Sequence, residues 1–394
     1  MNSEANPNPR EYERRIVAPA PLRIGIDGDA LRAPLSGVGR YVFNLCRELE
    51  ELLPRAHFFA YSRLPAQRLE LPSARFTLRS ESNPSMSRLP SFVWLKTRGR
   101  ALCERDQLHY FWANRTLHPR LGRPVRTVCT VHDLNHLLVP ETMQVPTLWS
   151  HRLWFERDLY LAQHVVANSK GTAERVRTLL RKPVREVVPP GLDASYQPQT
   201  SEQQRAAHAA LSARNIAPPY LLSVATHEPR KNIHALVEAF VELKQAGSLA
   251  GFRLLLVGAS GWKNQRLERA LRDGARFGVL TTGYVPQEIL PALYSNAEAF
   301  VFPSLYEGFG MPVLEARACG TRVLASDSPE LREAGGPHAT FVEPSPEGSR
   351  AGILKTLAAP RNPESDLNQR YSWKRSAARL ASLFTQDHPA ESYA

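Results

Sequence analysis

The stretch that decides the fold runs from Phe300 to Gly320 and reads FVFPSLYEGFGMPVLEARACG. It opens with an apolar, β-rich run that predicts a strand ending at Pro303, and a glycine-flanked loop, EGFG at 307–310, follows. Pro312 is typical of the first position of a helix, because proline lacks an N–H that would have no partner there. A strand, a glycine loop and a helix in this order predict one unit of an α/β sheet.

The start of this helix is predicted to bind an anion. The amides of Val313 and Leu314 are expected to have no partner within the helix and to point outward, where the helix dipole assists them. The backbone of Gly308 and Gly310 can approach a ligand closely, because neither residue carries a side chain. A phosphate group suits such a site.

Two carboxylates bracket the predicted anion site, Glu307 in the loop and Glu315 one turn into the helix. A carboxylate beside a phosphate is unfavourable unless it binds something else, and sugar hydroxyls are suitable donors. We therefore interpret the pair as contacts for a ligand that carries both phosphate and sugar. The alternative is a strand–loop–helix unit in which the acids are incidental.

The same alternation of strand and helix extends along most of the 394 residues. Apolar, β-rich runs predict strands at 22–27, 125–132, 164–168, 186–189, 220–226, 252–258, 279–283, 299–303 and 321–326. Apolar residues at helical spacing predict helices at 38–53, 150–161, 171–180, 233–243, 265–277, 348–357 and 371–384. Asn232 is expected to cap the helix that begins at Ile233.

Strict alternation predicts parallel sheets with helices on both faces, hence an α/β protein of two Rossmann-like domains with a cleft between them. The length suits two domains, which we expect at 21–200 and 220–360. A proline-containing polar stretch predicts a linker at 201–219. Residues 1–20 are expected to form a disordered tail, and 361–394 a C-terminal helix and tail.

Further candidate residues stand where other predicted strands end, the edge at which α/β sheets bind ligands. Arg230 and Lys231 suit a diphosphate, since arginine binds it bidentately and lysine as a point charge; the alternative is a solvated basic turn. Gly37, in the sequence SGVG, is interpreted as a point where backbone approaches a phosphate or sugar, against a plain tight turn. His132 is a functional candidate, although a lone histidine is often structural.

Composition bounds the remaining possibilities. The net charge of +12 favours anionic partners, although the motifs of nucleic-acid-binding domains are absent. The sequence shows neither a membrane-spanning apolar run nor the apolar core of a signal peptide, so a cytoplasmic location is expected.

The four cysteines are scattered and are expected to be free, mostly buried thiols. Asp27-Gly28-Asp29 is not expected to bind a metal, because nothing near it completes a Mg²⁺ site.

These blocks together resemble glycosyltransferase family 4. The seven residues between Glu307 and Glu315 resemble that family's E-x7-E signature, within a block similar to its hallmark region. The segments SGVGRY, VHDLNHLLVPE, EPRKN and LLLVGASGWKN occur in the expected order, so the resemblance runs from about Arg23 to Phe384. Within the family, EPRKN is similar to mannosyltransferases of bacterial O-antigen, capsule and exopolysaccharide assembly.

The resemblance implies the GT-B fold, a C-terminal helix that returns to the first domain, retention of anomeric configuration, and no metal or other cofactor beyond a nucleotide-sugar co-substrate. GDP-mannose is the donor we expect first and a UDP-sugar second, with a saccharide or lipid-linked saccharide as acceptor. The resemblance implies a role for each candidate residue. Glu315 would bind the donor ribose, Glu307 would contact the donor sugar, and Arg230 and Lys231 would neutralise the diphosphate. His132 would line the transfer site, the backbone at Gly37 would approach the phosphate, and Tyr284 and Val285 would contact the base, while the donor would also contact Gly308, Phe309, Gly310, Val313 and Leu314.

Two features depart from the family pattern. Many members place the phosphate arginine several residues before the lysine, where this chain has Thr226, so Arg230 takes that role or Lys231 works alone. The region after Glu343 is also shorter than usual, which leaves the last crossover open. The alternatives to a transferase are a nucleotide-sugar epimerase of the same fold, a non-catalytic nucleotide-sugar-binding protein and, from charge alone, a nucleic-acid-binding protein.

A basic and apolar segment, Met86–Arg105, carries a separate hypothesis. It reads MSRLPSFVWLKTRGRALCER and contains five cations and one acid around the apolar run Phe92 to Leu95. Such a segment can lie on an anionic membrane, which predicts peripheral docking on the inner face of a bacterial membrane. The alternative is an ordinary surface helix with Trp94 packed inward.

Overall fold

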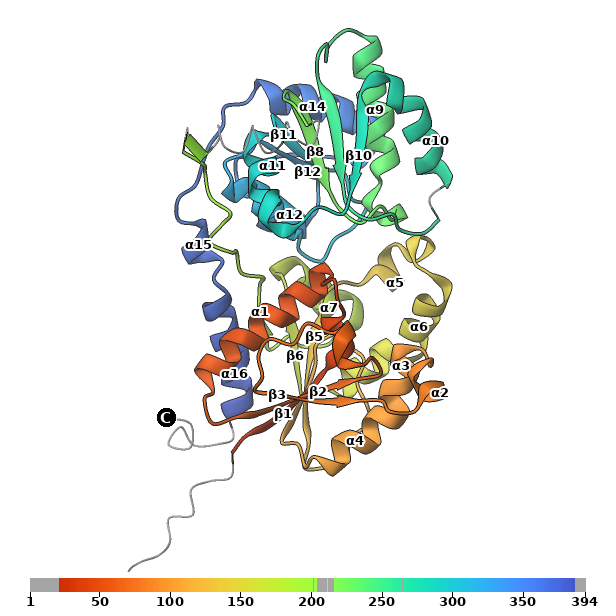
Figure 1. Cartoon of the computed structure of the whole chain (residues 1–394), viewed down its shortest axis with the longest axis vertical. Coiled ribbons are helices and arrows are strands. Elements are labelled where there is room, and N and C mark those ends of the chain that lie inside the picture. Colours follow the sequence, from red (N-terminus) through yellow and green to blue (C-terminus); the bar gives the residue numbers. More distant parts are fainter. Residues whose placement is uncertain (1–20, 201, 204–210, 212–215, 264, 387–394) are drawn as a thin grey trace, which may run out of the picture.

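The chain folds into two parallel sheets, each enclosed by helices and arranged one beyond the other along the long axis (Figure 1). This computed structural model describes residues 21–200, 202, 203, 211, 216–263 and 265–386. The predicted tail at 1–20, most of the predicted linker at 201–219 and the last eight residues of the chain lie outside the described residues.

The N-terminal sheet has seven strands in the order β3-β2-β1-β4-β5-β6-β7. All neighbouring pairs are parallel, and the chain reverses its direction of travel across the sheet between β1 and β4. The loops at such a reversal leave a crevice. The strands are β1 (Arg23–Asp27), β2 (His57–Ser62), β3 (Phe76–Ser80), β4 (Tyr110–Ala113), β5 (Arg126–Val131), β6 (His164–Ala167) and β7 (Glu186–Val187).

The C-terminal sheet repeats this topology with six parallel strands in the order β10-β9-β8-β11-β12-β13. Its reversal lies between β8 and β11, so the loops after these two strands border its crevice. The strands are β8 (Tyr220–Val224), β9 (Arg253–Val257), β10 (Val279–Gly283), β11 (Ala299–Phe302), β12 (Val323–Ser326) and β13 (Thr340–Val342).

Helices follow the strands and cover both faces of each sheet (Figure 1). Those of the N-terminal half are α1 (Gly37–Leu52), α2 (Pro84–Ser87), α3 (Ser91–Trp94), α4 (Arg100–Arg105), α5 (Asn135–Leu138), α6 (Val145–Leu161) and α7 (Lys170–Leu180). Those of the C-terminal half are α9 (Ile233–Gln245), α10 (Gln265–Gly274), α11 (Leu290–Asn296), α12 (Met311–Ala318), α13 (Pro329–Gly335), α14 (Pro346–Ala358), α15 (Leu367–Arg370) and α16 (Trp373–Thr385). None of the described helices is both long and apolar enough to cross a bilayer.

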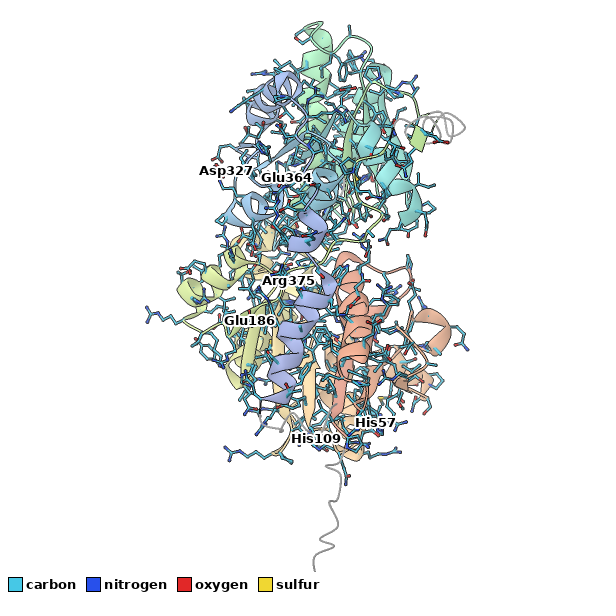
Figure 2. All side chains as sticks on the ribbon, turned by 90° about the vertical axis from the view of Figure 1, so that its left-hand side faces the viewer. His57, His109, Glu186, Asp327, Glu364 and Arg375 are labelled. Carbon is cyan, nitrogen blue, oxygen red and sulfur yellow. The ribbon has the colours of Figure 1, made fainter. Side chains whose placement is uncertain are left out.

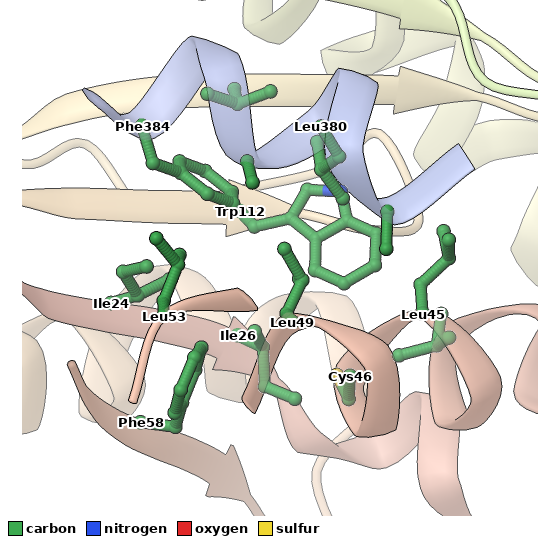
Figure 3. Close-up of a cluster of buried hydrophobic side chains, with 14 of the residues drawn as sticks. Ile24, Ile26, Leu45, Cys46, Leu49, Leu53, Phe58, Trp112, Leu380 and Phe384 are labelled. Carbon is green, nitrogen blue, oxygen red and sulfur yellow. The ribbon is translucent and has the colours of Figure 1, made fainter. Parts of the chain in front are cut away.

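The last helix, α16, packs on the N-terminal domain, as the resemblance predicts. Figure 2 shows it running down that domain from the level of Arg375, beside β7, where Arg379 pairs with Glu186 at 3.3 Å. Its inner face joins the core between β1 and α1, where Leu380 and Phe384 are fully buried (Figure 3). This burial brings the first described strand and the last described helix into one core.

The segment Met86–Arg105 forms the alternative structure, an ordinary surface helical region with Trp94 inside. Trp94 and Leu95 are 1% and 2% exposed, so neither is available to a membrane. Lys96 pairs with the buried Asp158, and Arg98 pairs with Glu81. The expectation that Trp94 and Leu95 face a membrane is therefore wrong, because both side chains lie in the core of their own domain, whereas Phe92 and Val93 are half-buried.

The four cysteines are buried and unbridged, as predicted. Asp27 and Asp29 are also buried, and each is held by an arginine of its own domain, Arg115 and Arg63 respectively.

Candidate functional site

The centre of the candidate site is a buried carboxylate held by two cations. The loop after β11 carries Glu307, and the loop after β8 carries Arg230 and Lys231. The Glu307 carboxylate lies 2.8 Å from Arg230 Nη1 and 2.6 Å from Lys231 Nζ. Glu228 holds the other side of the Arg230 guanidinium at 2.6 Å. The topological reversal of the C-terminal sheet thus brings together the three catalytic candidates of that half.

Backbone conformation fixes these two loops. Asn232 adopts a left-handed conformation with φ of 54°, and its side-chain amide donates to the carbonyls of Pro303 and Pro344. It therefore ties the β8 loop to the end of β11. Asn232 occupies the N-cap position of α9, as predicted, but its side chain makes no capping hydrogen bond to that helix.

The charges in this cluster shift one another's protonation. Burial alone would raise the pKa of Glu307, but the Arg230 and Lys231 charges outweigh it and lower the pKa to about 2. Burial and the neighbouring Arg230 charge lower the pKa of Lys231, against the opposing effect of Glu307. Burial would also lower the pKa of Arg230, but Glu307 and Glu228 raise it. Glu307 is accordingly a carboxylate at neutral pH.

His132 meets this cluster from the N-terminal domain, at the end of β5. Its carbonyl oxygen lies so close to Gly308 that a Cβ there would approach within 1.7 Å, which explains why the loop has a glycine at this position. Its imidazole donates from Nε2 to the carbonyl of Asn114 at 2.7 Å, which leaves Nδ1 as the acceptor. Burial lowers the pKa of His132, so the ring is neutral at pH 7.

Glu315 lies on α12, 3% exposed, and also has partners in both domains. Arg40 of α1 contacts one carboxylate oxygen at 3.0 Å, and the Tyr294 hydroxyl donates to the other at 2.9 Å. The cavity beside them has a volume of about 10 Å³ and is lined by Asp193, Tyr196 and Trp373, among other residues. That is room for about one water molecule, so a nucleoside does not fit here in this closed arrangement.

Arg40 and Tyr294 are site residues that the sequence analysis missed. Arg40 belongs to the quoted SGVGRY segment, but its partner Glu315 is 275 positions away in the sequence. Asp133, next to the candidate His132, also raises the pKa of Arg230.

The helix start after the glycine loop differs from the prediction. The amides of Val313 and Leu314 both donate to the carbonyl of Gly310, at 2.9 and 3.3 Å, so they are not free to bind an anion. The left-handed backbone of Gly310, with φ of 95°, turns that carbonyl toward them. Pro312 is the second helical residue rather than the first.

The remaining candidates lie around this centre. Gly37 is the first residue of α1, exposed, with open space where a side chain would stand. Phe309 is 3% exposed and packs in the core of the C-terminal domain, so its side chain is not available to a ligand. Tyr284 is 64% exposed after β10, and Val285 is half-buried beside it.

Comparison with known proteins agrees with this architecture. The model described as "Glycosyltransferase Family 4" matches residues 35–196, and the model described as "Glycosyl transferases group 1" matches residues 205–376. O-antigen chain mannosyltransferase B of Escherichia coli is 29% identical over 354 residues, which cover 85% of this chain and 91% of that protein.

Two solved structures share the fold. Sucrose-phosphate synthase from Thermosynechococcus elongatus has a TM-score of 0.73 at 20% identity, covering 93% of this chain and 98% of that one. HepE from Anabaena, solved in complex with UDP and glucose, has a TM-score of 0.65 at 15% identity, covering 93% of this chain and 100% of that one. The two family models together span most of the chain, in the order of its two sheets, and the chain belongs to the family 4 glycosyltransferases of GT-B fold.

Proposed function

We propose that this glycosyltransferase transfers mannose from GDP-mannose to a saccharide or lipid-linked saccharide in cell-envelope polysaccharide synthesis, with retention of configuration and without a metal. The name of the similar Escherichia coli protein supports mannose as the sugar and an O-antigen saccharide as the acceptor. The UDP in the similar HepE structure keeps a UDP-sugar as the second candidate donor.

The observation that carries the proposal is the buried cluster of Glu307, Arg230 and Lys231 at the sheet reversal. Two cations that share one carboxylate can turn toward a diphosphate without leaving that carboxylate uncompensated, because a sugar hydroxyl can donate to it. A nucleotide sugar offers both groups side by side. The cluster therefore suits a donor of this class better than a phosphate or a sugar alone.

The proposed reaction breaks the bond between the anomeric carbon and the donor phosphate oxygen and forms a bond from that carbon to an acceptor oxygen. Arg230 and Lys231 stabilise the negative charge that develops on the departing diphosphate. The acceptor approaches on the same face, and its hydroxyl proton passes to the departing phosphate oxygen. Neutral His132 lines this face and can accept a hydrogen bond at Nδ1.

A donor panel tests the proposal. Thermal unfolding with GDP-mannose, UDP-glucose and ADP-glucose should show the largest rise in Tm with GDP-mannose, because a ligand that binds only the native state stabilises it. Transfer to a mannosylated acceptor, followed by NMR of the new anomeric proton, should give the donor's configuration, with the rate unchanged by EDTA.

Four outcomes would contradict all or part of the proposal. Donor turnover without any acceptor, yielding an isomeric nucleotide sugar, would indicate an epimerase. Donor binding without turnover on any acceptor would indicate a non-catalytic binding protein. An inverted product, or loss of activity in EDTA that added metal restores, would refute the retaining or metal-independent part alone.

A further inference from the structure

Helix α6 exposes an apolar face that its own domain does not cover. Val145, Trp149, Leu153 and Tyr160 are 58%, 55%, 59% and 51% exposed. Their positions i, i+4, i+8 and i+15 place them on one side of the helix. The opposite side is buried, with Phe155 and Leu159 in the domain core. The helix is thus apolar on both sides, which is unusual for a helix that faces only water.

Two further exposed apolar side chains lie at the C-terminal end of α6 and on the neighbouring α7. Leu161 is 51% exposed, and Leu179 of the neighbouring α7 is 50% exposed. The Tyr160 hydroxyl donates to the carbonyl of Leu180, which holds the end of α7 against the end of α6. We call these six residues the α6 face: Val145, Trp149, Leu153, Tyr160, Leu161 and Leu179. Six large apolar side chains, each at least half exposed, form a larger surface than scattered single residues.

Cations border the α6 face. The Arg152 guanidinium lies 5.9 Å from the ring centre of Trp149, and Lys182 lies over the ring of Tyr160 at 5.6 Å. Arg152 is exposed, as is Arg181 at the end of α7, and within the described part of the chain neither makes an ion pair. Glu156, at position i+11, is an exposed acid on the same side of α6 as Trp149 and Tyr160. The balance is positive, which complements an anionic surface.

The position of α6 places this face beside the opening between the domains. The residues just before the helix meet the C-terminal domain, where Trp262 donates to the carbonyl of Thr142, and Lys263 to those of Glu141 and Met143. Figure 1 shows α5 and α6 on the side of the molecule away from α16, which closes the other side. A molecule held at the α6 face therefore lies next to the cleft.

We propose that the α6 face docks the protein on an anionic lipid bilayer. An aromatic and aliphatic face bordered by arginine and lysine gains from burial at the headgroup boundary and from attraction to anionic lipids. This proposal rests on exposure and charge alone, so it can fail while the proposed transfer reaction stands. The docking surface is α6 and the end of α7, not the Met86–Arg105 segment.

Co-sedimentation of the full chain with vesicles tests this assignment. The unmodified protein should bind vesicles of phosphatidylglycerol and phosphatidylethanolamine, bind phosphatidylcholine vesicles more weakly, and lose affinity at high salt. Trp149→Ser with Leu153→Ser should lower the partition coefficient at least about tenfold, since two large apolar contacts are lost. Arg152→Glu with Arg181→Glu should lower binding to anionic vesicles only.

Matched variants elsewhere make the test specific. Leu354→Ser and Arg55→Glu, at exposed positions distant in the sequence, should bind as the unmodified protein does. Arg98→Glu with Arg100→Glu should also bind normally; loss of binding there would assign docking to the Met86–Arg105 segment and overturn the proposal. Absent vesicle binding, or unchanged binding of the Trp149/Leu153 variant, would overturn it too.

Light scattering distinguishes a protein partner. If the unmodified protein is a dimer that does not bind vesicles, and the Trp149/Leu153 variant is a monomer, the α6 face contacts a second copy of this chain. That result would refute membrane docking. The proposal is supported if the unmodified protein is a monomer that binds vesicles, and if the Trp149/Leu153 variant loses this binding but still transfers sugar to a short water-soluble acceptor. The proposed transfer reaction is then unaffected.

Discussion

Glu307 is the residue on which the proposed chemistry converges, and its surroundings define a first prediction. Glu307→Gln keeps the side-chain size but removes the charge shared by Arg230 and Lys231. We expect turnover to fall by about 10²-fold or more, as for a lost transition-state contact, measured at saturating donor. Glu228→Gln also removes a partner of Arg230 but lies outside the glycine loop, and it should cost much less. Near-normal transfer by Glu307→Gln would remove it from the catalytic residues.

The two cations define a second prediction. Arg230→Ala and Lys231→Ala should each weaken binding of the matching nucleoside diphosphate by about 1.5–3 kcal/mol, the range for a lost hydrogen bond to a charged group. Calorimetric titration measures this directly. Arg266→Ala, on the outer surface of the same domain and paired with Glu238, is the control for loss of an arginine. If both Arg230→Ala and Lys231→Ala bind the nucleoside diphosphate as tightly as the unmodified protein, the diphosphate binds elsewhere.

Buried histidines define a third prediction, on pH. His136 is 5% exposed and packs against Phe155 with ring centres 4.2 Å apart. Burial, aided by the nearby His151 and Arg152, lowers its pKa to about 4. The unfolded chain, with a pKa near 6.5, binds more protons between these values, so this contribution to stability is complete above pH 6.5 and is lost as pH falls toward 4.

Unfolding temperature measured from pH 7.5 to 4.5 should therefore fall toward acid. His136→Phe keeps an aromatic ring without a titrating group and should flatten the curve, whereas the exposed His338→Gln should leave it unchanged. His132 acts in the same direction, since burial lowers its pKa as well. A pH dependence identical in His136→Phe and in the unmodified protein would contradict this account.

At the same scale, the site residues that could be predicted from the sequence are those that directly follow a predicted strand. Arg230 and Lys231 follow one strand and Glu307 follows another, so the rule for strand ends brought them together. Arg40 and Glu315 meet only after both domains close, which no local pattern reveals. The free amides expected at Val313 and Leu314 failed because Gly310 turns its own carbonyl onto them.

At the scale of elements, long periodic helices and most of the described strands were predictable, whereas four strands were not. Helices α1, α9 and α16 lie within two residues of their predicted limits. Strands β2, β3, β4 and β13 were not predicted. β4 has four residues, YFWA, all buried, so it lacks the alternation that marks a half-exposed strand. Such strands are specified by their neighbours in the sheet rather than by their own pattern.

The returning helix α16 gives an element-scale prediction. Leu380 is fully buried in the core that α16 shares with α1 and β1 (Figure 3). Leu380→Ala should lower the free energy of unfolding by about 2–5 kcal/mol, the range for a large-to-small change in a core. Denaturant unfolding measures the loss, with Lys374→Ala on the exposed side of the same helix as the control. A loss below that of Lys374→Ala would show that the helix is not docked in solution.

At the scale of the whole molecule, the two domains are held closed by contacts that a donor would have to replace. Arg175 of α7 pairs with Glu330 of α13 at 2.5 Å, and the Lys170 amide donates to Glu333. On the other side of the site, Arg40 pairs with Glu315, the carboxylate that the resemblance assigns to the donor ribose. The space there holds about one water molecule, so no nucleoside fits beside Glu315 in this closed arrangement.

The final prediction concerns this closure. Arg40→Ala removes the ion pair between α1 and α12 and leaves Glu315 with the Tyr294 hydroxyl as its remaining hydrogen-bond donor among the described contacts. A buried carboxylate without its cation is costly, and opening the domains returns it to water. We therefore expect a larger radius of gyration in small-angle scattering, with unchanged far-ultraviolet dichroism because neither sheet is touched. Arg98→Ala, which breaks a surface pair with Glu81 inside one domain, should leave the radius unchanged. In the proposed function a nucleoside diphosphate bridges the domains in place of Arg40, so adding it should return Arg40→Ala to the compact radius. A variant that is already as compact as the unmodified protein without ligand would show that α7 and α13 alone hold the domains closed.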